Sequence, residues 1–273
     1  MTNGFHENLP AAQYFELPNR VSKSVLMAHR KSSAHAYHAM NETVEQTAGM
    51  RMGSLVHTLV LEPGEMNARY AVGPDAARNT KEWKEWAAAQ VPGRELIKGS
   101  EYAEACAMAR WIERKPTISR LIRGAGPVEA SVLWSETDRL TGVTLDYRAR
   151  PDKLVQSPSI LVDLKTTADI SDRGIERTIL SFGYHLQMAL YMQGLAAVGK
   201  PVDHAVIVWV ENVAPYEARA TLLNQLWIDI AEAELAVLKV RHAECVAQGE
   251  WPGFEDAITD ADPPAWMLKG EMI

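Results

Sequence analysis

The sequence predicts a mixed α/β (α+β) protein in which a central mixed β-sheet is flanked by helices, with an additional N-terminal helical region. Three patterns support this prediction. Before residue 123, apolar side chains recur mainly every three or four positions, as in amphipathic helices. From Val128 the apolar period changes to two, which is typical of strands. Further along, strand-like runs alternate with two long helical patterns that begin near Tyr184 and Asn224.

The N-terminal part divides into an arm and a series of helices. Residues 1–20 contain Asn, Gly and Pro, and we expect them to form a flexible N-terminal arm. Ser22 is a candidate cap for a helix that runs toward Ala39, and Pro63 ends the next helix, which begins near Ala48. Shorter helices are expected at 82–89, 102–113 and 116–122.

The strands are expected in the second half of the chain. An antiparallel meander is predicted at 128–134, 141–149 and 160–165, with a hairpin-like turn at 156–159. Two further strands are expected at 204–211 and 217–221, and two helices at 184–198 and 224–248. We therefore expect a single domain over residues 21–250. Residues 251–273 are expected to form a tail that serves as an extended cover or an inter-subunit contact.

Composition narrows the class of protein. The chain has 273 residues, 47% of them hydrophobic, which supports a substantial core. A formal charge of −7 argues against a charge-driven, histone-like binder, although it does not exclude DNA binding through a local basic channel. Cys106 and Cys245 lie far apart without histidines at zinc spacing, so we interpret them as reduced thiols of a cytoplasmic protein. Neither a signal-peptide pattern nor an apolar run of about 18 residues is present, so no membrane span is expected.

The strongest functional signal is a pair of acidic residues with a lysine beside them. On a strand, Asp163 and Lys165 point to the same face, and Asp152 at the end of the preceding run can reach the same place. Such a pattern is most often a solvated ion pair. Here, however, Asp163 interrupts the apolar run of a central strand, where an unpaired charge would be costly. Carboxylates in this arrangement are the oxygen ligands that Mg²⁺ and Mn²⁺ prefer.

Several other residues allow two interpretations. His57 lies in an apolar helix and is either a hydrogen-bonded core residue or a metal ligand; the acidic pair favours the second. Gln187 and Tyr191 share one face of a buried helix, where they either line the acidic strand or form an ordinary core network. Glu129 is either a further active-site carboxylate or a surface residue.

Two cations in the N-terminal half also allow two interpretations. Arg78 and Lys81 precede the helix expected at 82–89. They could contact phosphate, but ordinary surface charge is the default for such residues.

Taken in order, these motifs resemble the RecE-type phage and prophage exonucleases, in the RecB-like branch of the PD-(D/E)xK nuclease superfamily. The resemblance covers roughly residues 22–245. It rests on the segments 53–63, 78–81, Glu129 with Trp134, 141–143, Arg150-Pro151-Asp152, 162–167 and 184–191. Each motif is weak alone, whereas their joint order is specific.

The resemblance implies a PD-(D/E)xK nuclease core and assigns roles to individual residues. It implies that His57, Asp152 and Asp163 bind the metal with help from the Leu164 carbonyl. It also implies that Lys165 is the catalytic lysine and that Mg²⁺ is the cofactor, for which Mn²⁺ would substitute. The residues expected to border the active site and the DNA are Gln187, Tyr191 and Thr166.

The implied activity is 5′-to-3′ digestion of linear double-stranded DNA, in the cytoplasm of a bacterial host. Digestion of one strand would leave a 3′ single strand for a phage annealing protein. A homo-oligomeric ring, a trimer or a tetramer, would thread the duplex.

Three alternatives remain open. A RecB- or Cas4-like nuclease for single strands is the first, but such relatives often carry four cysteines for an iron–sulfur cluster and this chain has two. A catalytically silent DNA-end-binding or recombination-scaffold protein is the second, against which the intact acidic residues and lysine argue. The third is a metabolic metalloenzyme, for which we find no substrate-pocket motif.

Overall fold

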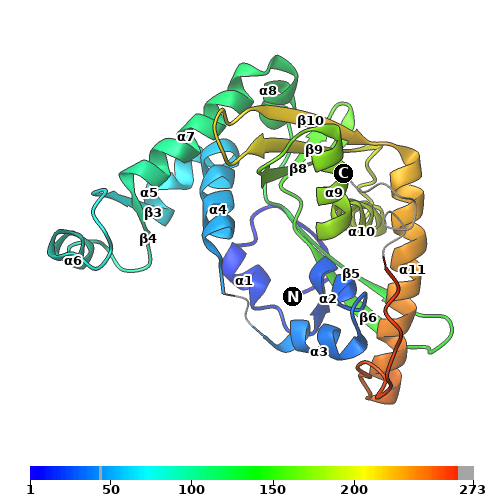
Figure 1. The fold of residues 1–273 in the computed structure, drawn as a ribbon. Coiled ribbons are helices and arrows are strands. Elements are labelled where there is room, and N and C mark those ends of the chain that lie inside the picture. Colours follow the sequence, from blue (N-terminus) through cyan, green and yellow to red (C-terminus); the bar gives the residue numbers. More distant parts are fainter. Residues whose placement is uncertain (43–44, 264–273) are drawn as a thin grey trace.

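Two four-stranded sheets form the centre of the molecule in the computed structural model, which describes residues 1–42 and 45–263 (Figure 1). The first has the order β1-β5-β6-β2, with bounds Gly4–His6, Ser131–Thr137, Thr144–Ala149 and Arg20–Val21. The second has the order β10-β9-β8-β7, with bounds Ala218–Leu223, His204–Glu211, Ser159–Thr167 and Lys153–Gln156. Each sheet contains one parallel pair, β2–β6 and β8–β9, and is otherwise antiparallel, so the predicted mixed α/β class is confirmed.

The predicted meander is correct for its first two strands and wrong for the third. Strand β6 ends at Ala149, and Pro151 has no N–H to continue the ladder. The chain crosses instead to the second sheet, where β7 pairs antiparallel with β8. The hairpin expected at 156–159 is confirmed, because Gln156 pairs with Ser159.

The second sheet separates two hydrophobic cores, since alternate residues of a strand point to opposite faces. Leu161 and Ile207 contribute to one core, whereas Val162 and Val208 contribute to the other. The first core is covered by α9 (Asp172–Phe182), α10 (Tyr184–Ala197) and α11 (Gln225–Gln248). The second is covered by α4 (Ala48–Leu61), α7 (Gly99–Arg114) and α8 (Pro116–Arg123). Helix α10 also contacts β5 closely, because a Cβ on Gly194 would lie 2.6 Å from the Trp134 ring.

The N-terminal segments differ from the prediction. Residues 1–20, expected to be a flexible arm, contain β1, which pairs with β5, and α1 (Ala11–Phe15), whose Tyr14 is buried. The single helix expected after Ser22 is divided into α2 (Lys23–Ala28) and α3 (Ser33–Asn41). The division has a local cause: the Ser32 side chain accepts a hydrogen bond from the His35 amide and caps a new helix.

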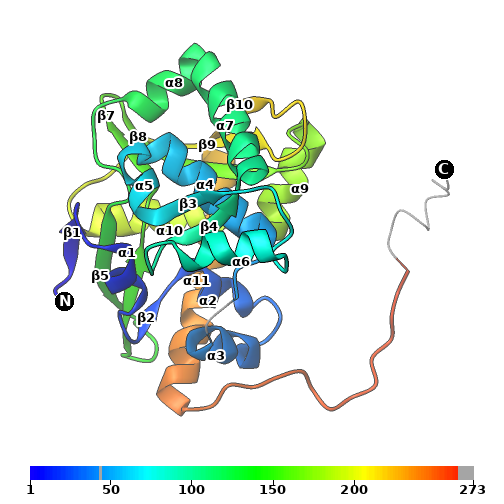
Figure 2. The same cartoon turned by 90° about the vertical axis from the view of Figure 1, so that its left-hand side faces the viewer.

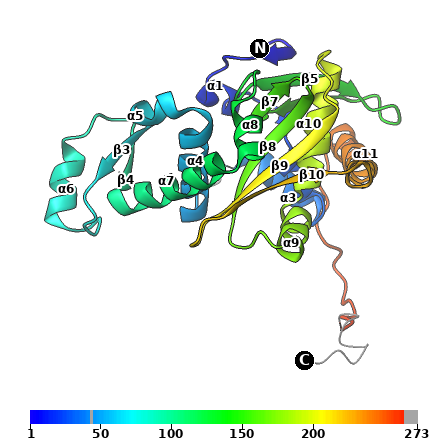
Figure 3. The ribbon, with the colours of Figure 1, turned by 90° about the horizontal axis from the view of Figure 1, so that it is seen from above.

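A small lobe projects from the body beside α4 and α7 (Figure 3). It contains a 3-10 turn (Pro63–Glu65), α5 (Met66–Arg69), β3 (Tyr70–Gly73), α6 (Lys81–Ala88) and β4 (Glu95–Lys98). The parallel β3–β4 pair was not predicted, since the strands are short and a helix separates them in the sequence. Helices α6, α7, α8, α10 and α11 lie within a few residues of their predicted positions.

The tail after residue 250, expected to be an extended cover or an inter-subunit contact, first packs against the segment around α2 and α3. Trp251 stacks on His29, and the Ala34 amide donates to the Pro252 carbonyl. Phe254 still lies edge-on to the His35 ring, and residues 255–263 extend away from the body (Figure 2). Part of the expected tail, residues 264–273, lies outside the described residues. Within the described ranges, no helix combines the length and apolar character that a membrane crossing requires.

Candidate active site

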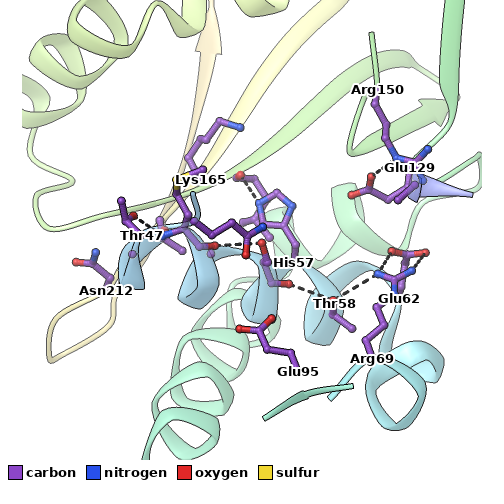
Figure 4. A pocket seen from close by; sticks show the side chains of 18 of the residues that line it. Thr47, His57, Thr58, Glu62, Arg69, Glu95, Glu129, Arg150, Lys165 and Asn212 are labelled. Atoms are coloured by element: carbon purple, nitrogen blue, oxygen red, sulfur yellow. Dashed lines mark hydrogen bonds and ion pairs between the residues drawn. The ribbon is translucent and has the colours of Figure 1, made fainter. Parts of the chain in front are cut away.

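An open groove of about 1040 Å³ runs between α4, the lobe and the ends of β8 and α9. His57, Glu129, Leu164 and Lys165 are among the residues that line it. In Figure 4, His57 lies between Lys165 and the Glu129–Arg150 pair. The groove is therefore lined by two of the four residues predicted to bind metal, His57 and Leu164, and by the predicted catalytic lysine; Asp152 and Asp163 are buried behind its wall.

Helix α4 places His57 in the groove. The helix is capped by Thr47, whose hydroxyl accepts a hydrogen bond from the Met50 amide at 3.2 Å. His57 Nε2 lies 2.7 Å from the Leu164 carbonyl oxygen, and His57 Nδ1 lies 3.6 Å from Asp152 Oδ2. Because a carbonyl only accepts, Nε2 carries the proton and Nδ1 presents its lone pair toward the carboxylates. Burial, and then the Lys165 charge, lower the pKa of His57 and keep the ring neutral, as a metal ligand must be.

Two carboxyl groups lie next to that lone pair. Ligand atoms of His57, Glu129 and Asp152 all lie within 4.8 Å of one another. Asp152 Oδ2 accepts a hydrogen bond from the Leu164 amide at 2.7 Å, which ties β8 to the start of β7. Glu129 has a φ of 52°, a left-handed conformation that is uncommon for a side chain of this size, and Arg150 holds it at 2.9 Å.

The electrostatics of this cluster favour a bound cation. Burial, and then the Asp152 charge, raise the pKa of Glu129 to about 7. Burial, and then the Asp163 charge, raise the pKa of Asp152. Two neighbouring carboxylates that repel each other are stabilised by a divalent cation, and a set of two carboxylates and an imidazole suits Mg²⁺ or Mn²⁺. The residues present therefore fit the metal that the sequence predicts.

Asp163 occupies a separate position from that cluster. It is 1% exposed, and its Oδ2 lies 2.6 Å from Lys165 Nζ on the same face of β8. Its Oδ1 accepts a hydrogen bond from Gln187 Nε2 at 2.7 Å. Burial lowers the pKa of Lys165, but the charges of Asp163 and Asp152 outweigh it and raise that pKa above its ordinary value. The described structure thus groups Asp163 with Lys165 and Gln187, and groups His57 with Asp152, Glu129 and the Leu164 carbonyl.

The remaining predicted residues are distributed around this centre. Thr166 lines the groove directly after Lys165. Burial raises the pKa of Tyr191 well above its ordinary value, and the charges of Asp163 and Asp152 act on it in the same direction. Arg78 and Lys81 are not among the residues that line the groove; they pair with Glu101 and Glu85 in and beside the lobe.

The sequence left two interpretations of Glu129 open, an active-site carboxylate or a surface residue, and suggested no role for Arg150. Arg150 donates to Glu129, to the Leu9 carbonyl at 3.0 Å and to the Ser131 hydroxyl at 2.8 Å. Its position next to Pro151-Asp152 is a signal in the sequence, but its partners lie far away along the chain. It orients Glu129 toward His57 and carries a positive charge into the groove.

Comparisons with solved structures support the fold. A candidate exonuclease from Eubacterium rectale superposes with a TM-score of 0.63 at 15% identity, over 97% of this chain and 99% of that one. An alkaline exonuclease (LHK-Exo) from Laribacter hongkongensis gives 0.37 at 14% identity, over 86% and 93% of the two chains. A phage related exonuclease from Haemophilus somnus gives 0.31 at 14% identity, over 86% and 97%. At these identities the first likeness shows a shared fold, and the other two scores are too low to add to it.

A comparison with family models identifies the chain more directly. No curated protein matches it. The model of a PDDEXK-like domain of unknown function (DUF3799) matches residues 22–258. Since this match spans most of the sequence, the chain belongs to the PDDEXK-like family DUF3799, and the predicted relation to PD-(D/E)xK nucleases is confirmed.

Proposed function

We propose that this chain is a Mg²⁺-dependent exodeoxyribonuclease that digests one strand of linear double-stranded DNA from 5′ to 3′ and leaves a 3′ single-stranded overhang. The observation that carries the proposal is the convergence of His57, Glu129 and the buried Asp152 at the wall of a groove that Lys165 also lines. The family relation supports nuclease chemistry. The 5′-to-3′ polarity comes from the resemblance to RecE-type exonucleases, and the E. rectale neighbour is itself described as an exonuclease.

The protein groups divide into those that hold the metal and those that act on the phosphate. His57, Asp152 and Glu129 would hold the metal, the Leu164 carbonyl would orient the His57 ring by accepting from Nε2, and Asp163 would add negative charge nearby. A divalent ion in this place supplies a water of lowered pKa and neutralises the phosphate. Lys165 stays protonated and directs its ammonium at the attacking water or at the charge that develops on the phosphoryl oxygens. Asp163 and Gln187 position that ammonium.

Recognition is proposed to depend on phosphates and not on base sequence. The groove presents Arg150 and Lys165, and backbone contacts of this kind are sensitive to salt but indifferent to sequence. We further propose a homo-oligomeric ring, a trimer or a tetramer, that threads the duplex and passes the 3′ strand to a phage annealing protein. In such an assembly processivity would come from topology.

One assay separates this proposal from its competitors. Blunt linear duplex, closed circular duplex and single strands are each incubated with Mg²⁺, Mn²⁺ or EDTA, and the duplex is labelled at either its 5′ or its 3′ end. We expect early release of the 5′ label from linear duplex only, with both metals and not with EDTA. Digestion confined to single strands would indicate a RecB- or Cas4-like nuclease. Binding of ends without hydrolysis would indicate a silent scaffold.

A further inference from the structure

An exposed aromatic side chain stands in the wall of the groove where α9 passes into α10. Phe182, the last residue of α9, is 58% exposed although it is a large apolar residue. Two other phenylalanines of the described chain, Phe15 and Phe254, are also exposed, but of these three only Phe182 lines the groove. Its exposure therefore falls on the surface along which the substrate is proposed to pass.

Phe182 is the outer member of a short stack that begins at the catalytic lysine. Lys165 Nζ lies 5.0 Å from the centroid of the Tyr184 ring. The Tyr184 and Phe182 rings are nearly parallel, with an angle of 16° between their planes and 5.7 Å between their centroids. Tyr184 thus covers one side of the Phe182 ring, and the high exposure leaves the rest of the ring open to the groove. The Lys165 ammonium is thus followed by the Tyr184 and Phe182 rings, and a nucleotide likewise presents a phosphate followed by a base.

The corner that carries this ring is held in place by its neighbours. Lys23 Nζ donates a hydrogen bond of 2.7 Å to the Phe182 carbonyl. Gly183 adopts a left-handed φ of 61°, and a Cβ at this position would lie 2.8 Å from Met27 Sδ. The turn between α9 and α10 is therefore fixed against α2, so little ordering would be needed when a ligand stacks on the ring.

We propose that Phe182 is a stacking platform for an unpaired nucleobase next to the phosphate that is cleaved. This inference rests on the proposed nuclease function and adds a base-binding subsite to it. Every base has a π-face, so a platform of this kind accepts any sequence but discriminates against a base that is still paired and stacked in the duplex. The subsite would hold the terminal nucleotide away from its complement, in line with the digestion of only one strand.

The test compares duplexes that differ only in whether bases are present at the end. One duplex carries normal nucleotides at the two terminal positions of the digested strand, and the other carries abasic analogues there. We expect Phe182→Ala to lower kcat/KM roughly 5- to 100-fold on the normal duplex and to leave it unchanged on the abasic one. Phe182→Trp should keep the wild-type rate on both. Leu180→Ala is the matched control, because Leu180 is an exposed apolar residue of the same helix that does not line the groove.

A second measurement does not depend on cleavage. The duplex carries 2-aminopurine at its terminal position, and EDTA prevents hydrolysis. Stacking on Phe182 should change the probe fluorescence with the wild type and with Phe182→Trp, but not with Phe182→Ala. The platform is overturned by equal losses on normal and abasic duplexes, or by a Phe182→Ala variant that matches the wild type in both measurements. A wild type that stacks the probe but cleaves no DNA would overturn the nuclease proposal and leave the platform standing.

Discussion

The buried pair His29 and His242 and the partly buried His57 lie in opposite kinds of surroundings. His29 and His242 are completely or almost completely buried and pair with each other at 3.0 Å, and His29 also contacts the Ser33 hydroxyl at 3.2 Å. His57 lies beside two carboxyl groups that repel each other, with one ring nitrogen turned toward them. In the first cluster neutral groups satisfy one another, whereas in the second the groups are left with excess negative charge. The difference teaches that a histidine inside the fold marks a binding site only when its neighbours still need a partner.

The largest expected effect comes from the acidic side of the second cluster. Asp152→Asn keeps an acceptor for the Leu164 amide but removes the charge, so we expect at least a roughly 10³-fold loss of exonuclease activity. Thermal unfolding without metal should occur at the same or a higher temperature than in the wild type, because a repulsion within the site is relieved. Asp229→Asn on the exposed face of α11 is the control and should change neither quantity. An active Asp152→Asn variant would contradict the metal assignment.

The second-largest loss of activity is expected when Lys165 is replaced. Lys165→Ala should lower kcat about 10²- to 10³-fold, as expected when one electrostatic group near the reacting phosphate is lost. Metal binding should persist, since His57, Glu129 and Asp152 remain. Single-turnover digestion and a metal titration on the same preparation check both expectations. Lys81→Ala, in the lobe and away from the groove, provides the comparison. Loss of metal binding together with activity would show that Lys165 supports the site only structurally.

The stabilisation by Mg²⁺ should depend on the cluster around His57 and not on the His29–His242 pair. Mg²⁺ at about 100 times its Kd should stabilise the wild type by about 2.7 kcal/mol, because binding occurs only in the folded state. The shift in unfolding temperature should disappear in Asp152→Asn and remain intact in His242→Asn, whose substituted residue lies among neutral partners. A shift that survives in Asp152→Asn would place the metal elsewhere.

The sequence predicted the local geometry of the candidate site better than the path of the chain around it. Asp163 and Lys165 share a face because a strand alternates, and a single short strand is enough to establish that. Glu129 could not be assigned in the same way, since its place depends on a left-handed φ and on Arg150, a partner across a sheet. The two-sheet arrangement was also missed, because nothing local in the sequence at Pro151 tells that the β7–β8 hairpin joins β9 and not β6. The periodicity of apolar residues therefore predicts helices, strands and the faces that their side chains share. Pairing between strands far apart in the sequence decides which of these faces come together.

A further expected effect concerns the neutral cluster and its pH dependence. Burial lowers the pKa of His29 and of His242 to about 4. The unfolded chain then binds more protons than the folded one between the ordinary histidine pKa, near 6.5, and about 4. The contribution of the two neutral histidines to folding stability is therefore complete above about pH 6.5 and is lost as the pH falls toward 4. Between pH 7 and pH 5 we expect a loss on the order of 2 kcal/mol for each histidine, measured by urea unfolding.

His242→Asn sharpens this last expectation. The Asn side-chain amide can stand in for Nδ1 of the imidazole, so the contact to His29 is kept while one titrating group is removed. The decline of stability below pH 6.5 should become shallower, since only His29 still titrates there. His38→Asn removes an exposed histidine from α3 and should leave the decline as steep as in the wild type. If His242→Asn leaves it equally steep, the acid sensitivity originates outside this pair, and the contrast between a satisfied and an unsatisfied buried histidine would have to rest on the metal experiments alone.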